Sequence, residues 1–388
     1  MICSTGSSSS SGRALGLLAL LACAAGCAGP RAAAAPSPPL RLSRVALFPA
    51  DNLSGGPVPL RGLDAQLERM LVAAGLKVVK GDEVERFLEH HRLRFTGGID
   101  EASAAAAREE LGVDAVLLTA VEGYASQPVP RLAATLRLVS AGPEARILWM
   151  DGVARAGDDS PGLLGLGLVR DYRALEAREL ARLGRSLSGA LAGVGRPAPP
   201  CELERRFRPR ASFRSPRFDP SAGYSVAVLP FLNQTSRRRA GEVFALELTR
   251  QLAAVRRLQV VEPGVTRDRL IRYRVIMEGG VSLDTARVML DTLQADLVVA
   301  GYARELVDGA TPSLEFTAMA LDRSGTVVWQ ATSHATGSDG VWFFDAGKVS
   351  TATSLACQLA RGAVVTFLGE DDLALPLGTR SQAREARQ

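Results

Sequence analysis

The sequence of 388 residues is poor in lysine, histidine and aromatic side chains, and each shortage narrows the functions it can have. Lysine occurs three times, so arginine supplies nearly all the positive charge behind the formal net charge of +5. An arginine-, alanine- and glycine-rich chain with so little lysine is typical of a GC-rich genome, so its basic balance is weak evidence for nucleic-acid binding. Beyond the N-terminal region no uncharged apolar run reaches the roughly 18 residues of a transmembrane helix.

Motifs of common catalytic sites are also missing. The chain has no Walker loop, no Gly-x-Ser-x-Gly and no His-Glu-x-x-His. His90 and His91 are adjacent on a predicted helix and point about 100° apart, so they cannot form the one-turn pair that holds a metal. His334 has no visible partner, so all three histidines are interpreted as surface residues. We therefore predict no catalytic residue, metal or cofactor, and an envelope hydrolase stays a hypothesis without a supporting constellation.

The N-terminal segment resembles a bacterial lipoprotein signal. One charge, Arg13, precedes the apolar run of residues 14–22, which is too short to span a bilayer but suits a signal peptide. Small residues then precede Cys23 and Cys27, and Cys27 is preferred for lipidation because it leaves a fuller apolar run. Neither cysteine is followed by Asp, so the resemblance implies the periplasmic face of the outer membrane. The alternative is an ordinary secretory signal cut near Ala34 or Ala35.

Export bears on the other cysteines and on the partners. The predicted mature chain keeps Cys201 and Cys357, and the bacterial periplasm permits disulfides. One bond between them and two free buried thiols are both left open. An exported location also removes nucleic acid as a normal partner.

The chain repeats itself at a nearly constant offset, which predicts a tandem duplication. Each copy opens with a buried strand that ends in proline and an asparagine turn, followed by an amphipathic helix. Later, a Gly-Gly pair precedes an N-capping residue, Asp100 or Ser282, and an Asp opens the next strand. Trp149 and Trp329 occupy the same place in the last strand and are interpreted as packing residues. The recurring residues are Val45, Ala46, Pro49 and Asn52 in the first copy and Val226, Ala227, Pro230 and Asn233 in the second.

This pattern predicts an α/β fold: two tandem copies of a β-α-β-α-α-β-β-β-α domain, each a mixed sheet covered by helices. The predicted division has six segments. They are a signal peptide (1–26), an Ala/Pro tether (27–41), the first copy (42–194), a Pro/Arg-rich linker (195–224), the second copy (225–370) and a polar tail (371–388).

Two arginine-rich segments are candidate binding sites. The linker has too many prolines to predict regular structure, and its seven arginines outnumber three acids. Interleaved with phenylalanine, these arginines could bind lipopolysaccharide phosphate or an acidic partner, because guanidinium groups match phosphate. The alternative is a solvated linker that repels itself. The candidate residues are Arg205, Arg206, Arg208 and Arg210 in the linker and Arg237, Arg238 and Arg239 after the first strand of the second copy.

Residues 226–235, 260–262 and 295–301 resemble a group of envelope proteins with a CsgG-like domain: the curli-secretion lipoprotein CsgG, the penicillin-binding-protein activator LpoB and the N-terminal domain of TolB. The resemblance implies a non-enzymatic adaptor or assembly factor that contacts an envelope protein, with a homo-oligomer among the open states. The alternative is a CsgG-like component of an outer-membrane secretion or assembly complex. No segment between the predicted strands has room for the long pore hairpins of CsgG, and pore conductance in lipid bilayers would distinguish the two hypotheses.

Overall fold

The computed structural model describes residues 39–159, 166–193, 201, 207–275, 279–341 and 347–369. Residues 37–388 form one compact unit. Cys23, Cys27, Arg205 and Arg206 lie outside the described residues. In the part of the chain that is described, none of the helices combines the length and apolar character needed to cross a bilayer.

The first copy folds in the predicted order. Its elements are β1 (Arg44–Leu47), the short β2 (Asp51–Asn52), α2 (Leu60–Ala73), β3 (Lys77–Val79), α3 (Asp82–His90), α4 (Glu101–Leu111), β4 (Ala115–Ala125), β5 (Arg131–Ser140), β6 (Ile147–Ala156) and α5 (Tyr172–Leu191). The strands form a mixed sheet in the order β3-β1-β4-β5-β6, with β2 beside β4. The β3, β1 and β4 strands are parallel, and β4, β5 and β6 form an antiparallel meander.

The second copy repeats this order. Its elements are β8 (Tyr224–Val228), β9 (Leu232–Asn233), α6 (Ala240–Ala253), β10 (Leu258–Val260), α7 (Pro263–Arg272), α8 (Leu283–Leu293), β11 (Leu297–Val307), β12 (Ser313–Asp322), β13 (Val327–Thr336) and α9 (Ala352–Leu368). Its sheet runs β10-β8-β11-β12-β13, with β9 beside β11. The predicted fold, two tandem copies of a mixed sheet covered by helices, is confirmed.

The linker departs from the prediction of irregular structure. Strand β7 (Ala211–Arg214) pairs with β13 at the edge of the second sheet. The prolines do not prevent this, because none of them lies within these four residues, and an edge strand needs partners on one side only.

The repeated residues make equivalent hydrogen bonds in both copies. Asp114 accepts hydrogen bonds from the backbone of Ser43 and Arg44 and so joins the start of β4 to β1, and Asp296 does the same for β11 and β8 through Ser225. Asp100 and Ser282 cap α4 and α8 as predicted. Asn52 and Asn233 hold local turns, which confirms that turn chemistry explains them.

Both tryptophans are buried beneath the closing helix of their copy. Trp149 donates its indole hydrogen to Ser186 of α5 at 3.2 Å, and Trp329 donates to Thr366 of α9 at 3.0 Å. An indole that is buried needs such a partner for its N–H group. The interpretation of both residues as packing residues is confirmed.

Candidate functional site

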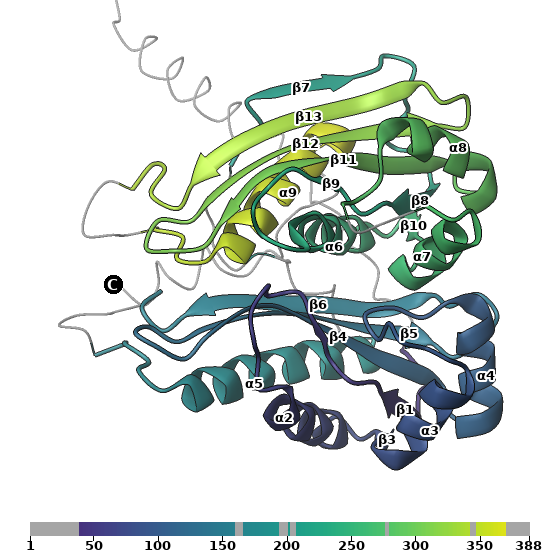
Figure 1. Ribbon diagram of the computed structural model, residues 1–388, viewed down its shortest axis with the longest axis vertical. Helices are drawn as coiled ribbons and strands as arrows, with labels where there is room; N and C mark the ends of the chain where they lie inside the picture. The colour runs from purple at the N-terminus through teal and green to yellow at the C-terminus, as the bar shows by residue number, and fades with distance from the viewer. Residues whose placement is uncertain are drawn as a thin grey trace, which may run out of the picture. The chain divides into compact units, whose positions relative to one another are not determined.

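The two copies are joined through the helices of the second. Helices α6 and α9 cover one face of their own sheet and also contact β6 of the first copy, so this helical layer lies between the two sheets (Figure 1). Leu53, Ala120 and Met150 of the first copy belong to the same apolar core as α6 and α9. Helices α2 and α5 cover the opposite face of the first sheet. We call the contact between the first sheet and the α6/α9 layer the joint.

The joint contains a buried ion pair. Arg137 on β5 donates two hydrogen bonds of 3.2 Å to Glu262, the residue that caps α7, and both side chains are buried. Arg137 also donates to the carbonyl oxygen of Gly97. The backbones of Gly98 and Gly264 meet beside this pair, and a Cβ added to Gly98 would lie 2.8 Å from the nitrogen of Gly264. A bidentate pair fixes both the distance and the direction between its two side chains, so it helps to fix the position of one copy relative to the other.

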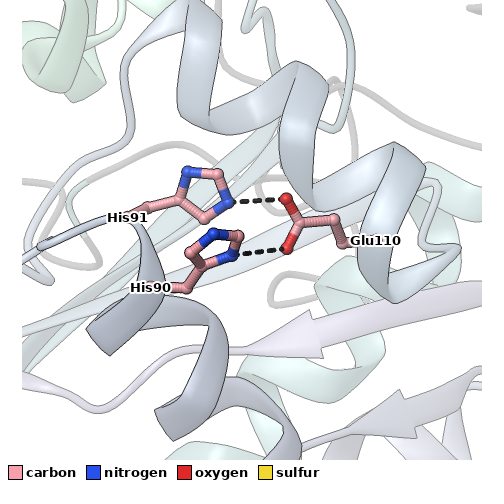
Figure 2. A group of neighbouring side chains, drawn as sticks. All are labelled: His90, His91 and Glu110. Atoms are coloured by element: carbon pink, nitrogen blue, oxygen red, sulfur yellow. Dashed lines mark hydrogen bonds and ion pairs between the residues drawn. The ribbon is translucent and has the colours of Figure 1, made fainter.

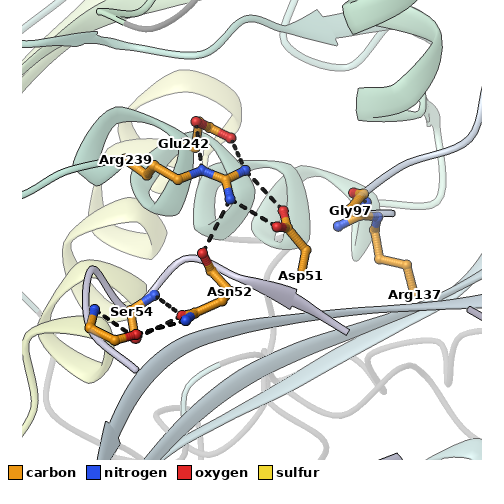
Figure 3. A network of polar contacts seen from close by, with 8 residues as sticks. Asp51, Asn52, Ser54, Gly97, Arg137, Arg239 and Glu242 are labelled. Atoms are coloured by element: carbon orange, nitrogen blue, oxygen red, sulfur yellow. Dashed lines mark hydrogen bonds and ion pairs between the residues drawn. The ribbon is translucent and has the colours of Figure 1, made fainter. Parts of the chain in front are cut away.

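A second group of charges crosses the joint near the start of α6. The guanidinium of Arg239 contacts Asp51 of the first copy at 2.8 Å and Glu242 of its own helix at 2.7 Å (Figure 3). It also donates to the carbonyl oxygen of Asn52. These carboxylates hold the pKa of Arg239 above its usual value, against the effect of burial. Arg237 donates to Asp308 and to the carbonyl oxygen of Glu122.

A third group is wholly buried in the middle of α6. Arg250 donates to Glu247 at 2.6 Å and to the Sγ atom of Cys357 at 2.9 Å. Glu122 on β4 of the first copy lies close enough for its charge to act on both. Burial raises the pKa of Glu122 well above its usual range, and the negative charge of Glu247 adds to the effect. Burial also raises the pKa of Glu247, although Arg250 opposes this.

A partly open pocket of about 60 Å³, to which both copies contribute, lies at the joint. Phe95 and Asp51 of the first copy line it together with Glu242 and Arg267 of the second, and the guanidinium of Arg267 lies 4.1 Å from the centre of the Phe95 ring. The volume admits a few water molecules or a small ion and is far below the roughly 300–1,000 Å³ of pockets that bind organic ligands. We therefore interpret the joint as a structural contact.

The outer face of the second sheet is the counterpart of the joint. Helices α7 and α8 pack on the part of it formed by β8 and the start of β11, and the remainder is open. Along β13, half-exposed Gln330, Thr332 and His334 alternate with buried Ala331 and Ala335. Such alternation is typical of an antiparallel sheet with one face in water.

Charged side chains cross this open face between neighbouring strands. Arg304 on β11 contacts Glu315 on β12 at 3.3 Å, and Arg210 from the linker lies 2.7 Å from Nδ1 of His334. We call this surface, on β11, β12 and β13 with the adjoining β7, the open face. Its mixed charges and hydroxyl groups suit contact with a protein surface.

The structure separates the predicted arginines. Arg237 and Arg239 lie in the joint, where each contacts carboxylates. Arg238, between them, is exposed, and so are Arg208 and Arg210 of the linker. Strand β7 brings Arg210 to the open face.

Sequence reasoning missed the buried charges of the joint, although a signal was present. Glu247 and Arg250 interrupt the apolar residues of α6, and Glu122 follows seven buried residues of β4. Charged residues within such apolar runs indicate that a second surface contacts the helix or the strand. The residues that complete each cluster come from the other copy, so the sequence pattern does not identify them.

The Cys201–Cys357 pair, which the sequence left open, is a disulfide. It joins the linker to α9, and both residues are buried. Gln251 of α6 donates to Sγ of Cys357 at 3.2 Å, so the bond lies at the edge of the buried charges.

Comparison with protein families finds no matching family model, and comparison with curated proteins finds no match either. Among solved structures, the PelC dodecamer from Paraburkholderia phytofirmans is similar at 20% identity over 40% of this chain and 96% of PelC, with a TM-score of 0.28. Lipoprotein GNA1162 from Neisseria meningitidis matches at 18% identity over 37% and 99% of the two chains, with a TM-score of 0.27. The LpoB C-terminal domain from Escherichia coli matches at 14% identity over 31% and 87%, with a TM-score of 0.26. Similarities of this size do not establish membership in a family.

Proposed function

We propose that this protein is a lipid-anchored, non-enzymatic adaptor or assembly factor of the bacterial cell envelope. In this proposal Cys27 carries the lipid at the periplasmic face of the outer membrane, and the two copies form a rigid head that contacts an envelope protein. Two features support the location. The N-terminal segment resembles a lipoprotein signal, and the buried Cys201–Cys357 disulfide is the kind of bond that persists in oxidising compartments.

The open face is the observation that supports a binding role. The same face of the first sheet is covered by α6 and α9, so both faces of that sheet serve the fold. On the second sheet β13 presents half-exposed polar side chains instead, β12 adds Ser313 and Glu315 near its start, and the linker arginine Arg210 lies beside them. A rigid, polar, mixed-charge surface at the end of the molecule is suited to a protein partner.

Fractionation of cells tests the anchor. We expect Cys27→Ala to release the protein from the membrane fraction, whereas Cys23→Ala leaves it there. Release by Cys23→Ala alone would show that Cys23 carries the lipid. If neither substitution changes the fraction in which the protein is found, the anchored model is wrong.

Chemical crosslinking in intact cells followed by purification tests the open face. Gln330→Arg adds a long charged side chain to the centre of β13, and Ala181→Arg adds the same side chain to the exposed outer surface of α5 as a matched control. We expect the first variant to lose a crosslinked envelope protein that the wild type and the control retain. Equal recovery from all three proteins would contradict binding at the open face.

The linker arginines have their own test. Replacing Arg208 and Arg210 by serine should weaken the same crosslink if they contribute to the partner site. Loss of binding to lipopolysaccharide vesicles instead of loss of the protein crosslink would identify phosphate as the group they recognise.

A further inference from the structure

Two neighbouring histidines of the first copy converge on one carboxylate. Nε2 of His91 lies 2.8 Å from Oε1 of Glu110, and Nδ1 of His90 lies 3.4 Å from Oε2 of the same side chain (Figure 2). The three ligand atoms all lie within 4.8 Å of one another. The sequence alone did not indicate this group, because Glu110 comes from another helix.

The end of α3 explains why both rings reach the same point. The helix ends at His90, and His91 is its C-cap, so the two residues are not both within regular helix. Arg92 then takes a left-handed conformation with φ of 53°, which turns the chain away. The centres of the two imidazole rings are 4.8 Å apart. The N–H of His91 still bonds to the carbonyl oxygen of Phe87, so the two side chains leave the helix end in different directions, and each ring reaches a different oxygen of Glu110.

The backbone around the group favours a cation. Helix α3 ends at His90 and helix α4 ends at Leu111, one residue after Glu110. Two helix C-termini therefore meet here, and the C-terminal end of a helix carries partial negative charge. Glu110 adds a full negative charge. The site therefore combines two imidazoles with a carboxylate and two helix ends that are all negative.

One ligand is held firmly while the site remains accessible. The His91 ring packs 4.6 Å from the ring of Phe87, a buried core residue, and its side chain is 26% exposed. The side chains of His90 and Glu110 are 72% and 40% exposed. A packed imidazole restricts the rotamers of the site, and the exposed side leaves room for a water ligand.

From this geometry we propose that His90, His91 and Glu110 form a binding site for one divalent transition-metal ion, with Zn²⁺ as the probe that best suits the ligand set. Two imidazoles and a carboxylate with an open fourth position are a ligand set that Zn²⁺ uses. Ligand atoms around tetrahedral Zn²⁺, at bond lengths of about 2.0 Å, lie about 3.3 Å apart, close to the distances that already separate these nitrogens and oxygens. The ion would take the place of the two hydrogen bonds and tie the end of α3 to the end of α4.

The chain contains a comparison group on the open face. Glu305, Glu315 and His334 also bring their ligand atoms together. There, however, Arg210 lies 2.7 Å from Nδ1 of His334 and Arg304 contacts Glu315 at 3.3 Å. Two guanidinium groups beside these ligands repel a metal ion. His334→Ala is therefore a matched control for the loss of one histidine.

Calorimetric titration of the full chain with Zn²⁺, after chelation and purification without a polyhistidine tag, tests the proposal. We expect one equivalent of Zn²⁺ to bind and to raise the Tm of the protein. His91→Ala and, separately, Glu110→Gln should lower the affinity at least tenfold, while His334→Ala leaves it unchanged. Glu110→Gln keeps the size of the side chain, so a folded variant is available even if His91→Ala disturbs the packing against Phe87.

Absorption of the Co²⁺-loaded protein adds a direct readout of the ligands. Intense visible bands of four-coordinate Co²⁺ in the wild type, lost in both site variants and kept in His334→Ala, would support the site. Absence of stoichiometric binding, or equal binding by wild type and Glu110→Gln, would overturn it. Loss of binding in His334→Ala with retention in the site variants would do the same.

Discussion

The two copies share one fold but expose different surfaces, and one face of the sheet shows this most clearly. In the first copy, most of β4, β5 and β6 is buried on both faces. Helices α2 and α5 cover one side, and α3 and α4 together with α6 and α9 of the second copy cover the other. In the second copy, β13 alternates between buried and half-exposed residues along its length, whereas β11 and β12 do so only over part of theirs. The duplication therefore stacks one domain on the next, and the stack ends with a polar sheet.

A single position shows how each sheet suits its surroundings. Gly152 on β6 and Thr332 on β13 are equivalent, since each lies three residues after the tryptophan and opposite a threonine of the neighbouring strand. A Cβ at Gly152 would lie 2.2 Å from Nη1 of Arg250, so glycine makes room for the guanidinium of the second copy. Thr332 faces no such group, and its hydroxyl pairs with Thr317 at 3.1 Å.

The helices that pack on these sheets differ in the same way. By the offset of the duplication, Arg69 on α2 corresponds to Arg250 on α6, and Arg69 is exposed whereas Arg250 is buried beside Glu247. Repeat architectures need terminal units with polar outer surfaces, otherwise stacking continues. The outer surfaces of the two stacked copies both carry polar residues, which is consistent with a stack of two copies and no more.

Removing Arg250 from the joint should have the largest effect on the free energy of unfolding. Arg250→Met leaves Glu247 buried without its partner, and breaking a buried ion pair by removing one member costs about 3–5 kcal/mol. Arg69→Met, the same change at the equivalent exposed position, should alter stability by less than about 0.5 kcal/mol. Urea denaturation of the two variants measures the difference, and equal losses would contradict the asymmetry of the copies.

Removing the disulfide comes next. The described part of the first copy has no counterpart of the bond that joins the linker to α9. We expect the double substitution of Cys201 and Cys357 by serine to lower the free energy of unfolding by about 2–5 kcal/mol. Hydrogen exchange followed copy by copy should show the loss in α9 and α6 with little change in α2 and α5. Uniform loss over both copies would mean that they unfold as one cooperative unit.

These comparisons show what the sequence could and could not reveal. The order of elements follows from local signals, such as apolar periodicity, Asp100 and Ser282 as caps, and turns at Asn52 and Asn233, and these lie within a few residues of the structure they specify. The joint depends on contacts between residues more than a hundred positions apart, such as Arg137 with Glu262. Periodicity cannot pair such residues, so the sequence indicates Arg237 and Arg239 as candidate binding residues of a loop and does not reveal their carboxylate partners. The division into domains and the binding role of the arginines stay predictions.

Exchanging the glycine and the threonine sharpens the comparison on a smaller scale. Gly152→Thr places atoms where Arg250 lies, and overpacking a buried site of this kind costs about 1–3 kcal/mol. The reverse change, Thr332→Gly, loses one hydroxyl contact and adds chain flexibility on an open strand, for which we expect about 1 kcal/mol or less. Thermal unfolding of both variants ranks them, and a larger effect for Thr332→Gly would show that the second face is more constrained than its exposure suggests.

The last expected effect depends on pH and concerns Glu122. Burial raises its pKa in the folded protein, so folding takes up a proton in the range between the unfolded value, 4.5, and the raised folded value. Stability from this group is complete below that range and falls as pH rises through it, by about 1.4 kcal/mol for each pH unit over which the two states differ by one proton. Glu247 and Arg250 from α6, with Asp151 from β6, are the charged groups whose fields act on it or on its partners.

Glu122→Gln keeps the shape of the side chain and removes this titration. We therefore expect the variant to equal the wild type in stability near pH 4 and to gain on it steadily as pH rises, so that the difference between the two, measured by denaturation across pH 4–9, has a positive slope. Arg304 lies at the equivalent bulge of β11, exposed on the open face, and Arg304→Gln should give no such slope. A flat difference for Glu122→Gln would mean that Arg250 holds that carboxyl in its charged form, and that the joint is stabilised by a network of ions instead of a protonated acid.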